Sequence, residues 1–292
     1  PPLAGAAGWT SVTSTTSYNA NVSYTLSGSD GSKTLYAWYK DVAGNVSGTA
    51  NASITLDTTS PTGAVTINGG ASATSGTTAS LTLLATDTYG VSQMKFSNDN
   101  STWSSAESYA TTRTWTLATG DGAKTVYVKY QDNAGNWSGA YSDTITLDSI
   151  APAGSLNVNS GAWYTGTTTV TLNLSATDSV GVAGYYVSET STTPSAGASG
   201  WVMVTSVTGY SANVSYALSG GDGAKMVYAW YKDTADSISS PASKSIVLDA
   251  TPPTVASTYP ASNGTGLALN GFITATFSEV MDTATVGTST FT

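Results

Sequence analysis

The chain has 292 residues, of which 40% are hydrophobic and only 9% are charged, and its formal net charge is −9. This hydrophobic content is enough for packed cores, while the acidic balance with a single arginine excludes a nucleic-acid-binding protein, which needs clustered cations. No apolar run reaches the roughly 18 residues of a membrane-spanning helix, and the absence of cysteine excludes the inter-sheet disulfide of antibody domains.

Repeated segments organise the chain. SDGSKTLYAWYKDVAGN at 29–45, GDGAKTVYVKYQDNAGN at 120–136 and GDGAKMVYAWYKDTADS at 221–237 align without gaps. A second element follows each of them, namely ITLD at 54–57, ITLD at 145–148 and IVLD at 246–249. Both elements recur after 91 and then 101 residues, as the starts at 29, 120 and 221 show. A shared period near 100 residues indicates duplication of an immunoglobulin-like sandwich.

One full unit, 61–151, is predicted to hold only short strands. In residues 79–87, small and apolar side chains alternate with polar ones, and valine, threonine and tyrosine favour pleated structure. Turns rich in glycine, aspartate and asparagine separate the runs, a pattern typical of an antiparallel sandwich. The strands are expected at 63–68, 79–87, 91–97, 103–109, 112–118, 123–131 and 141–148.

Two core positions recur in every unit. An aromatic residue occupies the first and leucine the second, both on the inward side of a predicted strand. We therefore expect Trp115 and Tyr216 to be buried. The two recurring sets are Tyr24, Trp115 and Tyr216, and Leu26, Leu117 and Leu218.

Proline-containing linkers divide the chain into domains. DTTSPT, DSIAPA and DATPPT each follow a repeated element, and proline ends strand pairing there. The predicted fold class is all-β, with tandem immunoglobulin-like antiparallel β-sandwiches in an extended array. The predicted domains are the C-terminal part of a repeat at 1–60, complete repeats at 61–151 and 152–252, and the N-terminal part of a further Ig-like domain at 253–292.

The motifs also carry a family resemblance. The run FSNDNSTWSS…WTLATGDGAKTVYVKYQDNAGNWS…ITLD, which ends before a proline, resembles the Ig-like repeats of very large extracellular bacterial proteins. PTVASTYPASNGTGLALNGFITATFSEVMD at 253–282 resembles the start of the SbsA-type Ig-like domain of surface-layer proteins and adhesins. The resemblance implies an extracellular or cell-surface location and a spacer or assembly role, with no catalytic residues.

The residues themselves also argue against an enzyme. The sequence has no histidine and none of the HExxH, GxSxG or GxxxxGK[ST] motifs. Paired carboxylates could act as the acid and base of a glycosidase. However, the acidic residues recur at turns in every repeat, which an active site would not do.

The recurring acids allow a calcium hypothesis. In an Ig-like sandwich, the entering linker and the loops after the second and sixth strands lie at one pole, and oxygen ligands from several loops suit Ca²⁺. The alternative is that these residues close turns through their own backbone. The expected groups are Asp57, Asp87, Asp132 and Asn136 at the first junction, Asp148, Asp178, Asp233 and Asp236 at the second, and Asp249 with Glu279 at the third.

Aromatic side chains form a second candidate site. Tyr36 and Trp38 are expected to point away from the core, and Tyr228 and Trp230 repeat this arrangement. Exposed aromatic rings could stack on sugars or pack against another subunit. Alternatively, they cover the outer face of the sheet or contact an adjoining domain.

The favoured function is structural, as a component of an extracellular filament, stalk or surface layer. The alternatives are an adhesin or polysaccharide-binding segment, and a spacer in a secreted polysaccharide hydrolase. The expected partners are further copies of the chain, head-to-tail or lateral, or other surface proteins, and glycans. Residues 253–292 could complete residues 1–60 of a neighbouring copy by strand addition, or both could belong to a longer polypeptide.

Overall fold

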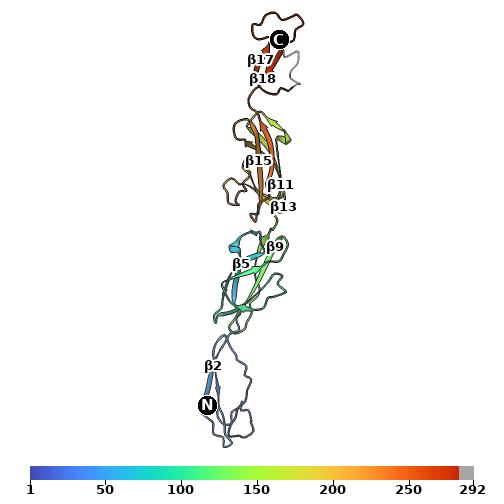
Figure 1. Cartoon of the computed structure of the whole chain (residues 1–292). Coiled ribbons are helices and arrows are strands. Elements are labelled where there is room, and N and C mark those ends of the chain that lie inside the picture. Colours follow the sequence, from blue (N-terminus) through green and yellow to red (C-terminus); the bar gives the residue numbers. More distant parts are fainter. Residues whose placement is uncertain (283–292) are drawn as a thin grey trace. The chain divides into compact units, whose positions relative to one another are not determined.

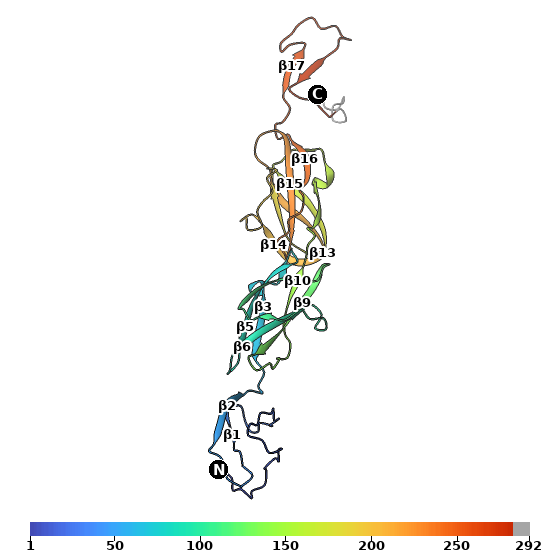
Figure 2. The same cartoon turned by 60° about the horizontal axis from the view of Figure 1, so that its bottom comes forward.

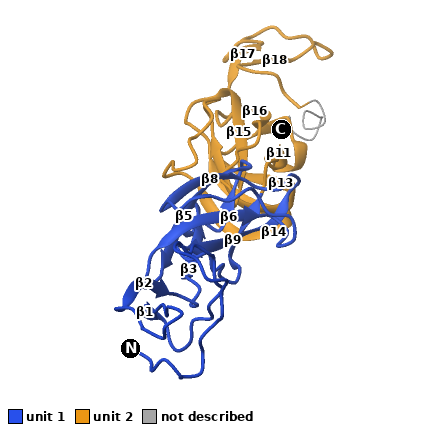
Figure 3. Cartoon of the chain, turned by 90° about the horizontal axis from the view of Figure 1, so that it is seen from below, with its two compact units in different colours: residues 1–147 blue, residues 148–292 orange. Residues whose placement is uncertain are grey.

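The computed structural model describes residues 1–282, which form strands, short 3-10 turns and loops (Figure 1). The chain divides into two compact units, Pro1–Leu147 and Asp148–Thr292 (Figure 3). No α-helix occurs among residues 1–282, so the all-β prediction is confirmed. Nor does this described part contain a helix that is long and apolar enough to span a membrane.

Residues 1–60 contain a two-stranded antiparallel sheet, formed by β1 (Gly31–Ala37) and β2 (Ala50–Leu56). Tyr24, which precedes this sheet, is 71% exposed. Its predicted core position is therefore wrong. The reason is that β1 and β2 form the only sheet in residues 1–60, which leaves no second layer to cover this side chain.

Residues 61–147 form a sandwich of two sheets (Figure 2). The predicted strands are present, but the one expected at 103–109 is reduced to two residues, and a short strand, β4 (Ala73–Thr74), pairs in parallel with β10 (Tyr141–Leu147). One sheet has the order β3 (Thr62–Ile67), β5 (Thr78–Thr86), β8 (Thr112–Thr116). The other has the order β4 (Ala73–Thr74), β10 (Tyr141–Leu147), β9 (Gly122–Asp132), β6 (Val91–Ser97), β7 (Glu107–Ser108).

The core of this sandwich follows the predicted alternation. Leu81 and Leu83 of β5 are buried, whereas Leu84, on the opposite face of the strand, is 61% exposed. Trp115 packs against the core with its ring 5.2 Å from that of Phe96, but it is only half-buried. The expected burial of Trp115 is therefore met in part.

Residues 152–252, the last repeat, use the same arrangement with longer strands. β13 (Thr169–Ser188) runs through a bulge between Thr177 and Val182. Before the bulge it pairs with β11 (Ala153–Val158) and after it with β15 (Gly223–Asp233), so this single strand takes the positions of both β5 and β6 of the middle sandwich. Tyr216 packs half-buried against the core. The strands are β11 (Ala153–Val158), β12 (Tyr164–Thr165), β13 (Thr169–Ser188), β14 (Val202–Ala217), β15 (Gly223–Asp233) and β16 (Ala242–Leu248).

The C-terminal segment begins with one antiparallel pair, β17 (Val255–Tyr259) and β18 (Thr274–Phe277). The domain expected at 253–292 lies partly outside the described residues, which end at residue 282.

A glycine sets how closely β11 approaches β15. A Cβ atom added to Gly154 would overlap the ring of Tyr231. We expect Gly154→Ala to lower the free energy of unfolding of the last repeat by about 1–3 kcal/mol, because the core must shift to admit the methyl group. Gly209→Ala in β14 is the control, since its added Cβ would meet no atom within 4 Å. Equal urea midpoints for the two variants would contradict this expectation.

The same tyrosine predicts an alkaline instability. The Tyr231 hydroxyl donates a hydrogen bond to the Ser155 carbonyl at 2.5 Å, and burial raises the pKa of Tyr231 to about 12. An unfolded tyrosine has a pKa near 10. Between these values the unfolded chain has lost the proton and the folded chain has kept it, so stability falls as pH rises. We expect urea titrations from pH 9 to 12 to show a steeper decline for wild type than for Tyr231→Phe; parallel declines would contradict it.

Candidate metal sites

Three aspartates of unit 1 form a cluster, called here the first cluster. Asp57 follows β2, Asp87 follows β5 and Asp132 ends β9. One carboxylate oxygen from each lies within 4.8 Å of the other two. Asp57 and Asp132 are buried, and Asp87 is half-buried. The structure thus brings together the three acids that the sequence placed at the first junction.

Hydrogen bonds within the turns hold one oxygen of each carboxylate. Asp132 Oδ1 accepts from the backbone amides of Ala134, Gly135 and Asn136 at 2.7–2.9 Å. Asp57 Oδ1 accepts from the Thr59 amide at 3.2 Å, and Asp87 Oδ1 accepts from that of Tyr89 at 2.7 Å. Turn closure, the alternative explanation, therefore accounts for the Oδ1 atom of each aspartate.

The second carboxylate oxygen of Asp57, Oδ2, in contrast, is buried and has neither a hydrogen-bond donor nor a cation beside it among the described residues. Burial, and after it the charges of Asp87 and Asp132, raise the pKa of Asp57. Burial also raises the pKa of Asp132, but hydrogen bonds from Asn136 and the neighbouring amides outweigh it and lower the pKa overall. Neither ion pair found within residues 1–282 involves these acids.

A second cluster, Asp148, Asp178 and Asp233, has the same construction in unit 2. Asp148 follows β10, Asp178 lies at the bulge of β13, and Asp233 ends β15. One oxygen from each again lies within 4.8 Å of the others. Asp148 and Asp233 are almost completely buried, and Asp178 is 8% exposed. Burial, with a smaller contribution from the charge of Asp178, raises the pKa of Asp233.

Two oxygens of the second cluster have no hydrogen-bond partner among the described residues, although both are buried: Asp178 Oδ2 and Asp233 Oδ2. Their Oδ1 atoms accept backbone amides, from Val180 and Gly181 for Asp178 and from Ala235 and Ser237 for Asp233. The carboxylates of Asp178 and Asp233 are thus each fixed through Oδ1, while Oδ2 is buried without a donor among the described residues.

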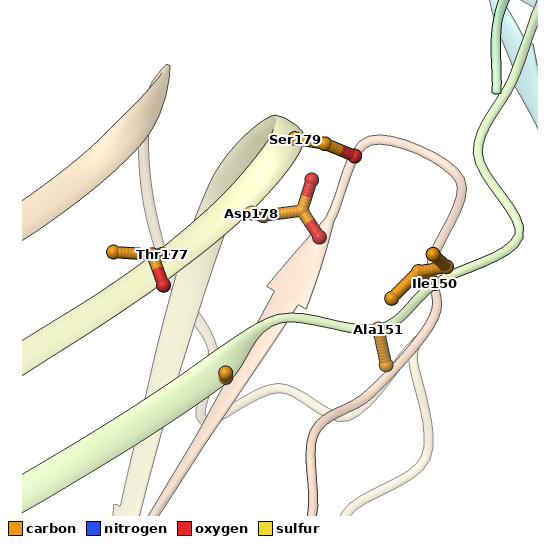
Figure 4. A pocket seen from close by; sticks show the side chains of 6 residues that line it. Ile150, Ala151, Thr177, Asp178 and Ser179 are labelled. Atoms are coloured by element: carbon orange, nitrogen blue, oxygen red, sulfur yellow. The ribbon is translucent and has the colours of Figure 1, made fainter.

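The second cluster also borders a hollow of about 330 Å³ (Figure 4). Figure 4 shows the Asp178 carboxylate pointing away from the ribbon of β13, toward the linker that carries Ile150 and Ala151. Asp178 is the most exposed of the three aspartates, so this hollow is the side from which an ion would approach the cluster.

Asp236 does not belong to the second cluster. Its Oδ1 atom lies 2.9 Å from Lys232 Nζ, and its side chain is 64% exposed. The expected role of Asp236 is therefore wrong, because Asp236 forms an ion pair with Lys232 instead.

The third junction is incomplete among the described residues. Glu279 Oε1 is buried without a hydrogen-bond partner in that part of the chain, and burial and the charge of Asp249 raise the pKa of Glu279. Asp249 is exposed, and no third acid joins this pair to form a cluster within residues 1–282.

The ligand chemistry of both complete clusters fits Ca²⁺. The chain has neither histidine nor cysteine, so its side chains offer metal ions mainly oxygen. Ca²⁺ takes six to eight oxygen ligands, typically carboxylates, backbone carbonyls and waters. Buried carboxylate oxygens without donors are where such an ion would bind.

The aromatic candidates differ between the repeats. Tyr36 is 58% exposed and stacks on Trp38, with ring centroids 6.1 Å apart, and Tyr228 is half-buried. In contrast, Trp230 is 0% exposed. The expected exposure of Trp230 is therefore wrong.

Trp230 is covered by Tyr186, its cross-strand neighbour on β13. Tyr186 packs edge-on against Trp230 at 6.0 Å and against Trp201 at 5.7 Å. Trp201 lies in the segment between β13 and β14, within the stretch from Asp178 to Asp233, which is ten residues longer than the stretch from Asp87 to Asp132.

Comparison with known proteins identifies part of the chain. Residues 249–292 match the family model of a bacterial Ig-like domain. No curated protein sequence matches the chain.

Solved structures resemble it at low identity. Fibronectin(III)-like modules of Clostridium thermocellum CbhA are 16% identical, cover 63% of this chain and 93% of their own, and give a TM-score of 0.40. The D00-D0 domain of intimin is 14% identical, with 64% and 100% covered and a TM-score of 0.31. A tetra-tandem repeat from the extending region of a large adhesion protein is 21% identical, with 78% and 58% covered and a TM-score of 0.26.

Proposed function

We propose that this chain is a structural segment of a bacterial cell-surface protein, in which Ca²⁺ fastens the linker entering each Ig-like repeat to the sandwich that follows. One observation carries the proposal: the same three-aspartate cluster occurs at corresponding positions of two successive repeats. Asp148 and Asp178 follow Asp57 and Asp87 by 91 residues, and Asp233 follows Asp132 by 101.

The division of the ligands gives the mechanism. Asp57 and Asp148 belong to the linkers, whereas the other four aspartates belong to strand ends and loops of the sandwich. Without a cation, three carboxylates this close repel one another, and this repulsion adds to the effect of burial, which is the main cause that raises the pKa of Asp57 and of Asp233. A bound Ca²⁺ reverses the sign of that interaction and ties the linker down.

A surface location suits this chemistry. Clusters of three carboxylates are modest Ca²⁺ sites, and extracellular modules commonly bind Ca²⁺ at 10⁻⁴–10⁻³ M. The bacterial Ig-like match at 249–292 supports the same class of protein. Filament, stalk and surface layer remain equally compatible forms, with self-association of the chain as the expected contact.

An adhesin that binds glycans is the second candidate. The exposed Tyr36, stacked on Trp38, offers a ring face for a sugar. The corresponding face of the last repeat is covered at Trp230, so an aromatic platform is not a repeated feature. A spacer in a secreted hydrolase would need a catalytic domain beyond this segment.

Surface labelling tests the proposed location. Antibodies raised against the chain should label intact cells of the producing bacterium, and externally added protease should remove the signal. Labelling that appears only after the cells are permeabilised would overturn the proposal.

A further inference from the structure

We infer that the residue four positions after the last aspartate sets the cation affinity of each cluster, so that the second cluster binds Ca²⁺ more tightly than the first. This residue is Asn136 in the first cluster and Ser237 in the second. The inference rests on the proposed function, since it ranks two sites that the proposal treats alike.

In the first cluster, an amide group already occupies one of the oxygens that a cation would use, whereas Asp57 Oδ2 has no donor among the described residues. Asn136 Nδ2 donates to Asp132 Oδ2 at 2.8 Å and to the Asp57 carbonyl oxygen at 3.1 Å. Both Asp132 oxygens are therefore engaged, because Oδ1 accepts three backbone amides. The Asn136 amide thus links the linker to the loop without any ion.

In the second cluster, that donor is missing. The Ser237 backbone amide still reaches Asp233 Oδ1 at 2.9 Å, but Asp233 Oδ2 is buried with no hydrogen-bond partner among the described residues. Asp178 Oδ2 is in the same condition. The two pKa values shift in opposite directions: at Asp233 burial outweighs the hydrogen bonds from Ser237 and Ala235 and raises the pKa, whereas at Asp132 the hydrogen bonds from Asn136 and the neighbouring amides outweigh burial.

The asparagine contact is a property of the turn itself. Asn45 makes the same two bonds to Asp41, from its backbone amide and from Nδ2, both at 2.8 Å. Asp41 is exposed and belongs to neither cluster. The amide therefore closes this turn regardless of a cation site, and at Asp132 it competes with a cation for the carboxylate.

The consequence is an ordered response to Ca²⁺. A cation entering the first cluster must displace or share the Asn136 hydrogen bond, whereas one entering the second meets two oxygens without donors. Losing one charge-assisted hydrogen bond corresponds to about tenfold in affinity. The second linker is thus fastened first as Ca²⁺ rises, and the first linker keeps an ion-independent tie.

The test is a calorimetric Ca²⁺ titration of the full wild-type chain and of variants in which Asn136 and Ser237 are each replaced by the residue found at the other position. Wild type should show a tighter and a weaker site, and Asp178→Asn should remove the tighter one. Asn136→Ser should tighten the weaker site about tenfold, and Ser237→Asn should weaken the tighter one by a similar factor. Far-UV circular dichroism in EDTA checks that each variant is folded.

Three results would overturn the inference. Weaker binding by Asn136→Ser would mean that the asparagine turns its oxygen to the ion and serves as a ligand. Unchanged affinities in both exchanges would mean that this position is irrelevant. Loss of the weaker site in Asp178→Asn would reverse the assignment. If wild type takes up no Ca²⁺ at all, the cation part of the proposed function fails instead.

Discussion

Leu81→Ala is expected to lower the free energy of unfolding of the middle sandwich by about 2–5 kcal/mol, the usual cost of emptying a buried leucine site. Leu81 is 0% exposed at the centre of β5, between the two sheets. The surrounding residues come from both sheets and cannot all close on the space left by the lost side chain.

Leu84→Ala on the same strand is the matched control. Leu84 is largely exposed, so its truncation should change stability by no more than about 0.5 kcal/mol. Urea titrations followed by tryptophan fluorescence compare the two variants. Similar losses in both would mean that β5 does not have the inward and outward faces described here.

Removing Ca²⁺ is expected to have the second-largest effect. A ligand that binds only the folded state at a hundred times its dissociation constant adds about 2.7 kcal/mol for each site. We expect EDTA to lower the melting temperature of the wild-type chain and excess Ca²⁺ to restore it. Mg²⁺ should restore it poorly, because it requires a more regular octahedral set of ligands.

Substitutions locate this effect. Asp178→Asn should abolish the Ca²⁺-dependent gain of the last repeat, because it removes one of three buried carboxylates. Asp236→Asn should retain the gain, since Asp236 lies outside the cluster and pairs with Lys232. A melting curve that EDTA leaves unchanged, or equal responses in the two variants, would contradict the metal assignment.

Local pattern was sufficient to predict the strands and the acidic clusters. Alternation in β5 identified Leu81 and Leu83 as core residues. The known order of loops in an Ig-like sandwich brought Asp57, Asp87 and Asp132 together, although they are far apart in sequence. These features depend on periodicity and topology, which repetition makes visible.

The misplaced residues depend on contacts that no local pattern encodes. Trp230 packs against Tyr186 of the neighbouring strand, and Tyr186 in turn packs against Trp201, which precedes β14. Asp236 is drawn away by Lys232. Tyr24 is exposed although its counterpart Tyr216 is half-buried, because a position faces a core only where a second sheet is present.

An anomalous difference map from crystals of the chain grown with Tb³⁺, a Ca²⁺ substitute, tests the central claim most directly. The account predicts one peak among Asp57, Asp87 and Asp132 and another among Asp148, Asp178 and Asp233, each at about 2.3–2.6 Å from the carboxylate oxygens. Peaks confined to other acidic residues, with both clusters lacking anomalous density, would contradict it.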